Sequence, residues 1–139
     1  MNVAKAAALI SCAIGATFVF GSYLLRSPAA HGAEQECSVA KLQGRYVFTG
    51  HGANLHYGTF DFDGAGKVSG KQTSLRNGVA EREILTGAYI LDGDCTGTMT
   101  FDGQPGGVAH WDVFVTGDGK KGNMIRTDSV AAGVRTFEQ

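Results

Sequence analysis

The sequence has few residues of the types that identify a reaction. Its 139 residues include 3 cysteines, 4 histidines and a single tryptophan, and no cysteine pair has the C-x-x-C spacing of thiol redox sites. The 12 basic residues form no continuous stripe, so we expect no nucleic-acid partner. No glycine-rich segment opens a helical pattern, which argues against a phosphate-binding loop. The sequence indicates no cofactor.

The chain also lacks charge from Ala6 to Leu25. Lys5 precedes this apolar run and the small-residue stretch RSPAAHGA follows it, which is the pattern of a secretory signal peptide. We predict a signal peptide over residues 1–33 and a mature domain over 34–139, periplasmic or secreted. Because about 20 apolar residues can also span a bilayer, an uncleaved anchor in the inner membrane is the alternative. Contact with a membrane is expected only in that case.

The predicted mature part is acidic and retains two cysteines. Lys5 and Arg26 fall in the signal segment, which leaves 10 basic residues against 13 acidic ones and a formal charge of −3. The remaining cysteines are Cys37 and Cys95, and an even number in a small exported domain predicts a disulfide. About 106 residues are enough for one domain with one core. Its oligomeric state is left open.

A seven-residue pattern occurs three times: GTFDFDG at 58–64, GAYILDG at 87–93 and GTMTFDG at 97–103. Each copy has apolar residues at alternate positions before an Asp-Gly pair, which hairpin turns favour. Alternate side chains of a strand share one face. Each copy therefore predicts a strand with one core-facing side. The leading glycine falls on that same face, where it allows a bend or close packing.

The same alternation predicts strands through the rest of the mature part, and only a turn or two within CSVAKLQG has a helical pattern. We predict a single all-β domain, an antiparallel up-and-down barrel of about eight strands of the calycin type. A flattened sandwich is the alternative, because periodicity does not separate the two. The predicted strands are residues 44–50, 57–62, 68–75, 82–91, 95–101, 109–115, 123–128 and 133–137.

The turn lengths predict how these strands pair. A three-residue loop in LDGDC sets Leu91 opposite Cys95, and the next hairpin sets Met99 opposite Trp111. With this register the inward face is apolar almost throughout.

Four polar residues near the C-terminus suggest acid–base chemistry: His110, Asp112, Arg126 and Asp128. The predicted register instead sets Asp112 opposite Arg126 and His110 opposite Asp128 on the outer face. Pairs of opposite charge on a sheet surface need no catalytic purpose. We therefore predict surface ion pairs.

The segments LTGAYILDGDCTGTMTF and NMIRTDSVAAGVRTF resemble a group of small exported bacterial proteins with G-x-Y, D-C-T-G-T and I-R-T-D signatures. These proteins in turn resemble the allene-oxide-cyclase-like and dirigent-like barrels. The similarity covers the chain from about Cys37 onward. Relatives of known role bind or cyclise small apolar molecules inside the barrel, so the resemblance implies a barrel and an internal cavity. No catalytic motif of those enzymes matches this chain residue by residue.

We predict that the barrel binds a small apolar ligand in its lumen. The candidate ligand-binding side chains lie on the predicted inward face, with the Tyr89 hydroxyl as the polar anchor: Phe60, Phe62, Tyr89, Met99 and Trp111. A cyclase or isomerase is the alternative. Its candidate acid–base group is Glu83, which faces inward near one mouth of the barrel, where burial would raise its pKa. A lumen filled by side chains would instead leave a structural or protein-interaction role.

His51 and His56 flank GANL in the first hairpin loop. Two histidines supply only part of a metal site. We interpret them as residues of a solvated loop and predict no metal site.

Overall fold

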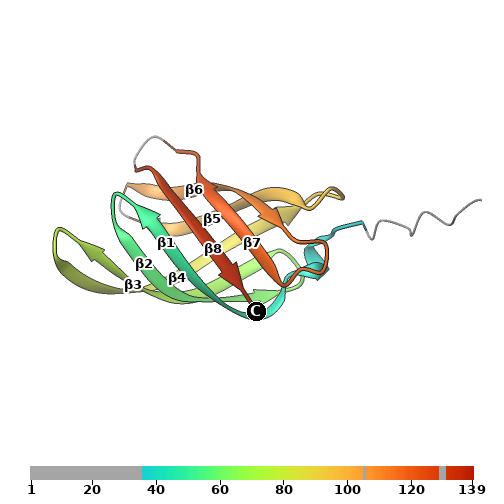
Figure 1. Cartoon of the computed structure of the whole chain (residues 1–139), viewed down its shortest axis with the longest axis horizontal. Helices are drawn as coiled ribbons and strands as arrows, with labels where there is room; N and C mark the ends of the chain where they lie inside the picture. The colour runs from blue at the N-terminus through green and yellow to red at the C-terminus, as the bar shows by residue number, and fades with distance from the viewer. Residues whose placement is uncertain (1–35, 105, 129–130) are drawn as a thin grey trace, which may run out of the picture. The chain divides into compact units, whose positions relative to one another are not determined.

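The computed structural model describes residues 36–104, 106–128 and 131–139. The described residues form one 3₁₀ turn, η1 (Val39–Lys41), and eight β-strands (Figure 1). The predicted signal peptide over residues 1–33 lies outside the described residues. The strands are β1 (Gln43–Gly52), β2 (Leu55–Asp63), β3 (Lys67–Arg76), β4 (Val79–Leu91), β5 (Thr96–Gln104), β6 (Gly107–Val115), β7 (Lys121–Arg126) and β8 (Gly133–Glu138).

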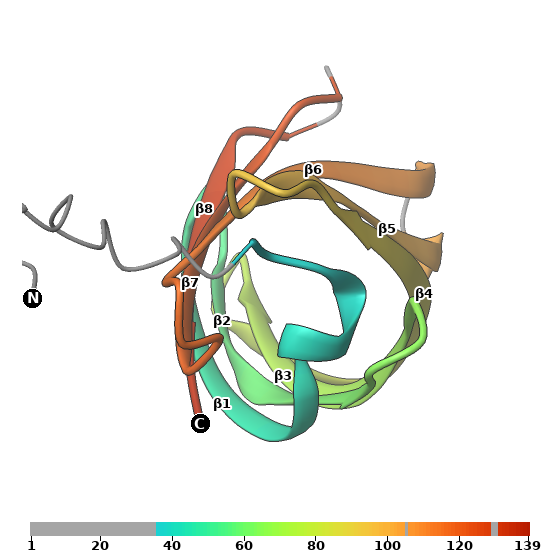
Figure 2. The ribbon, with the colours of Figure 1, turned by 90° about the vertical axis from the view of Figure 1, so that its right-hand side faces the viewer.

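The eight strands close into an up-and-down barrel in which each strand pairs antiparallel with its neighbours in sequence. Figure 2 shows the ring of strands from one end. Closure is made by β1 and β8, which pair from Val47 opposite Glu138 to Gly52 opposite Gly133. A sandwich would leave edge strands unpaired, so the predicted all-β barrel is confirmed.

The first glycine of the repeated seven-residue pattern lies where neighbouring strands approach closely. Gly58, Gly87 and Gly97 face the interior, and a Cβ atom on any of them would overlap a carbonyl oxygen of the adjacent strand. Close approach of a second backbone is one reason for glycine inside a strand. The predicted close packing is confirmed at all three positions.

The hairpin between β4 and β5 has a longer loop than predicted. Leu91 pairs with Gly97, so the predicted pair of Leu91 and Cys95 is wrong by two residues. The Asp92 amide donates to the Thr96 carbonyl oxygen at 2.7 Å. Cys95 lies in the loop and has a φ of 68°. A shift by an even number keeps each side chain on its predicted face.

The hairpin between β6 and β7 is offset by one residue. Trp111 lies opposite Arg126, so the predicted pairing of Asp112 with Arg126 is wrong. The connecting turn has four residues, 117–120, whereas the predicted pairing requires an odd number. An offset of one moves every side chain to the opposite face. Met124 is therefore buried, and Arg126 points toward the interior.

Aromatic and aliphatic side chains pack together inside the barrel. Phe60 stacks on Phe48 with 4.1 Å between ring centroids, and Phe101 lies 5.4 Å from Phe60. Met99 lies opposite Trp111, as predicted. The largest fully buried apolar side chains are Tyr46, Phe48, Phe60, Phe101, Leu42, Leu85, Met99 and Met124.

The segment containing η1 lies across one end of the barrel (Figure 2). The Tyr89 hydroxyl donates to the carbonyl oxygens of Val39 and Leu42, at 2.9 and 3.0 Å. The predicted disulfide is confirmed: Cys37, just before η1, is bonded to Cys95 with 5.0 Å between Cα atoms. These contacts close this end of the barrel.

Candidate ligand-binding site

A cavity of about 230 Å³ lies at the end of the barrel opposite η1. Small apolar residues of the segment 131–134 form part of its wall. Its polar and aromatic lining comes from seven strands and the turn between β1 and β2: His51, Asn54, His56, Arg76, Gln104, Trp111, Arg126 and Arg135.

Trp111 is the one predicted ligand-binding residue that lines this cavity. Phe60, Phe62, Tyr89 and Met99 are at most 4% exposed and pack within the core. The Tyr89 hydroxyl bonds η1 rather than projecting as a free anchor. These four residues do not line the cavity. Their contact with a ligand stays a prediction without support from this cavity.

Arg135 is the only charged residue that is buried among those described, with 4% exposure. Its guanidinium carbon lies 4.5 Å from the ring centroid of Trp111 and 5.0 Å from that of Phe48. Burial, and then the charge of Arg126, lower the pKa of Arg135 to about 10. The side chain therefore stays protonated at neutral pH.

Several hydrogen-bond donors beside the cavity are unused. Nε and Nη1 of Arg135 and Nε1 of Trp111 are buried with no hydrogen-bond partner within the described part of the chain. A buried donor without a partner costs about 1–3 kcal/mol, and more when it is charged. All three atoms are shielded from solvent, so a ligand in the cavity would bond them only after a shift of the Arg135 or Trp111 side chain.

The other two arginines of the cavity are paired with carboxylates. Arg126 Nε lies 2.8 and 3.0 Å from the two carboxylate oxygens of Asp128. Arg76 Nη1 lies 2.7 Å from Glu83 Oε1. No carboxylate of the described residues lies within ion-pair distance of Arg135, and its guanidinium group instead packs against aromatic rings.

The predicted surface cluster is divided between two faces of the barrel wall. His110 and Asp112 are exposed on the outer face, as predicted. Arg126 and Asp128 instead pair with each other at the cavity, and the His110 backbone amide, not its side chain, donates to Asp128 at 2.9 Å. The predicted cross-strand ion pairs are wrong because β7 is offset by one residue.

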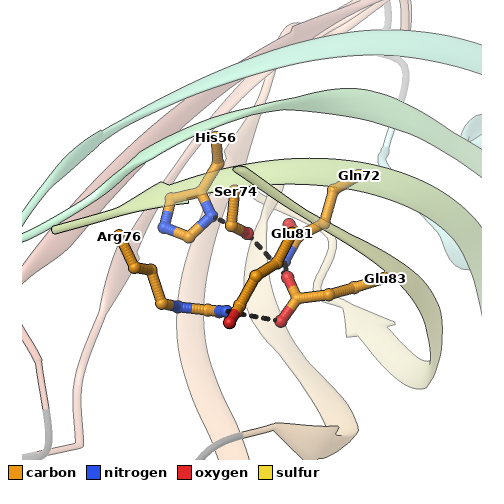
Figure 3. A network of polar contacts seen from close by, with 6 residues as sticks. All are labelled: His56, Gln72, Ser74, Arg76, Glu81 and Glu83. Carbon is orange, nitrogen blue, oxygen red and sulfur yellow. Dashed lines mark hydrogen bonds and ion pairs between the residues drawn. The ribbon is translucent and has the colours of Figure 1, made fainter. Parts of the chain in front are cut away.

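Glu83 faces the interior, as its position in β4 predicts, and is held by several donors (Figure 3). Ser74 Oγ donates to Glu83 Oε2 at 2.6 Å, and Gln72 Nε2 donates to the same oxygen. Burial acts to raise the pKa of Glu83, but the hydrogen bonds from Arg76, Ser74 and Gln72 outweigh it and lower the pKa to about 2. The predicted rise in pKa is wrong. An ionised carboxylate held in this way is a poor proton donor.

His56 lies next to this network. Its Nδ1 is 2.9 Å from Ser74 Oγ, and its other ring nitrogen points away from Ser74 (Figure 3). Burial lowers the pKa of His56 to about 4, and the charges of Arg135 and Arg76 add to this effect. The imidazole is therefore neutral at pH 7.

Gly50 separates His56 from Arg135. It pairs with His56 of β2 on one side and with Arg135 of β8 on the other, so the three residues share the inward face. A Cβ at Gly50 would lie 2.9 Å from Arg135 Cγ and 3.2 Å from His56 Cβ. The absence of a side chain at Gly50 lets the stems of His56 and Arg135 pack over its backbone.

Sequence reasoning missed Arg135 and the polar residues Gln72 and Ser74. Arg135 alternates with Phe137 in β8, and Gln72 and Ser74 alternate with Val68 in β3. A polar residue at a position where the pattern expects an apolar one is the signal that identifies all three.

The described ranges contain no cluster of residues that would hold a metal ion and no helix that could span a membrane. No three His, Cys, Asp or Glu residues within those ranges gather where they would hold a metal ion. His51 and His56 lie in β1 and β2 rather than in a loop. His51 is exposed, whereas His56 is part-buried and bonds Ser74, so its predicted solvated position is wrong. None of the helical segments described is long and apolar enough to cross a membrane.

The fold and the cavity define a small closed barrel with one covered end and a cationic cavity at the other. No protein-family model, no curated protein and no solved structure matches the chain. Its function is therefore inferred from the geometry of the cavity.

Proposed function

We propose that this protein is an exported barrel that binds a small organic anion in the cavity at its open end. The observation that carries the proposal is the buried, unpartnered guanidinium group of Arg135. Guanidinium donors match the two oxygens of a carboxylate, and the bonds are strong because both groups are charged. The Trp111 N–H is buried nearby and has no hydrogen-bond partner among the described residues.

The size and walls of the cavity support a ligand of about one ring. A dry cavity of about 150 Å³ is enough to hold benzene, so about 230 Å³ leaves room for a ring and a charged group. The alanines of segment 131–134 and the edge of Trp111 offer apolar contact. The ligand predicted from the sequence as apolar thus becomes, in this proposal, an apolar body with an anionic group.

Export and family membership belong to the same proposal. The disulfide between Cys37 and Cys95 supports an oxidising compartment outside the cytoplasm. The resemblance to allene-oxide-cyclase-like barrels stays a prediction. A cyclase or isomerase built on Glu83 receives less support, because hydrogen bonds hold that carboxylate in its ionised form.

Trp111 allows a direct test, because it is the single tryptophan of the chain and lines the cavity. We expect benzoate to change its fluorescence on titration and benzamide, the neutral analogue, to bind at least about tenfold more weakly. Arg135→Gln should weaken benzoate binding by at least about tenfold. Arg45→Gln, which removes an arginine whose side chain is 71% exposed on the outer face, should leave it unchanged.

The proposal is overturned by either of two results. One is a panel of aromatic and aliphatic carboxylates, sulfonates and inorganic phosphate that leaves Trp111 fluorescence unchanged up to millimolar concentrations. The other is an anion affinity that Arg135→Gln and Arg45→Gln reduce equally.

A further inference from the structure

The hydrogen bonds around Ser74 determine which nitrogen of His56 carries the proton. Glu83 is ionised and only accepts, so the single hydroxyl hydrogen of Ser74 goes to Glu83 Oε2. Ser74 Oγ must then accept the hydrogen bond that joins it to His56 Nδ1. The proton of the neutral imidazole is therefore on Nδ1.

A neutral imidazole with its proton on Nδ1 has a bare Nε2, which only accepts hydrogen bonds. This nitrogen lies on the side of the ring away from Ser74 (Figure 3). His56 and Arg135 both line the cavity, and both pair with Gly50 of β1. The cavity thus combines donors on Arg135 with an acceptor on His56.

We infer that the ligand carries a hydrogen-bond donor, such as a hydroxyl group, in addition to its anionic group, and that His56 Nε2 accepts this hydrogen bond. The ligand class is a small hydroxy acid of about one ring. The inference rests on the proposed function, because Arg135 binds the anionic group that places the hydroxyl beside His56.

The test compares acids with and without a hydroxyl group at pH 7, by titration of Trp111 fluorescence. The ligand sets are benzoate with its three monohydroxy isomers, and phenylacetate with its α-hydroxy derivative. We expect at least one hydroxylated acid to bind about tenfold more tightly than its parent. His56→Phe keeps a ring but removes both nitrogens, so it should abolish this preference. His51→Phe, at the other histidine of the cavity, should retain the preference.

Nitrogen-15 NMR of the unmodified protein gives a second measurement that does not depend on a variant. We expect His56 to show a protonated Nδ1 and an unprotonated Nε2 at pH 7. A proton on Nε2 would overturn the inference.

The two proposals fail in different ways. If parent acids bind through Arg135 but hydroxylation adds no affinity, or its effect survives His56→Phe, the inference is wrong and the proposed function stands. If no anion binds, both are wrong.

Discussion

Glu81 and Glu83 share one arginine but differ in their surroundings. Both bond Arg76 Nη1, yet the Glu81 side chain is 53% exposed and the Glu83 side chain 20% exposed. Glu83 also accepts hydrogen bonds from Ser74 and Gln72. Charged groups held by several part-buried donors contribute more than exposed ion pairs.

Replacing each glutamate by glutamine separates these two contributions. We expect Glu83→Gln to lower the free energy of unfolding by about 2 kcal/mol at pH 7, because it weakens charge-assisted hydrogen bonds. Glu81→Gln should cost less than about 1 kcal/mol. Urea denaturation at 25 °C measures both. Equal losses would contradict the special role of Glu83.

The effect of Glu83→Gln should depend on pH. The folded state lowers the pKa of Glu83 from 4.5 to about 2, so its contribution is complete above pH 4.5 and is lost as the pH falls toward 2. His56, with its pKa lowered from 6.5 to about 4, disfavours the folded state as the pH falls through that range. The stability difference between Glu83→Gln and the unmodified protein should therefore shrink below pH 4.5. A difference that is unchanged at pH 3 would contradict the lowered pKa of Glu83.

At the scale of the strand, β7 offers two adjacent residues that test its register. Met124 is 2% exposed and Ile125 is 46% exposed. Met124→Ala should lower the free energy of unfolding by about 2–4 kcal/mol, because it leaves a cavity in the core. Ile125→Ala should cost about 1 kcal/mol or less. The opposite ranking, in thermal or urea unfolding, would support the register predicted from the sequence.

The sequence predicts the strands of this barrel but not all of their pairings. Alternating apolar residues identify every strand, because each has one buried face, and Asp-Gly pairs mark several of the turns. The turn between β6 and β7 depends on local hydrogen bonds: Asp118 Oδ1 accepts from Thr116 Oγ1 at 2.6 Å and from the Lys120 amide at 3.1 Å. The glycines of TGDGKKG suit turns of even or odd length. The pattern therefore does not fix which face Arg126 occupies.

The candidate site is less predictable than the fold for a related reason. The apolar pattern identifies Trp111, but Arg135 interrupts that pattern and contributes through its charge. Its role depends on Gly50 and His56, which are distant in sequence and meet it only when β1 pairs with both β2 and β8. Such a site requires the closed barrel.

For the whole molecule, the disulfide and the cavity lie at opposite ends of the barrel. The bond joins residues 58 positions apart, and a loop of this size corresponds to about 4 kcal/mol in the chain-entropy model. Replacing Cys37 and Cys95 together by serine should lower the free energy of unfolding by about this amount. Anion affinity should not change. A folded double variant with weakened anion binding would show that the two ends are coupled.

The closed end of the barrel also holds both ends of the described domain. β1 begins there, β8 ends there, and the Gln139 side-chain amide donates to the Gln43 carbonyl oxygen at 2.9 Å. A linker fused after Gln139 would extend from the end of the barrel opposite the cavity. The protein can thus be attached to a sensor surface through its C-terminus while the cavity stays open to the sample.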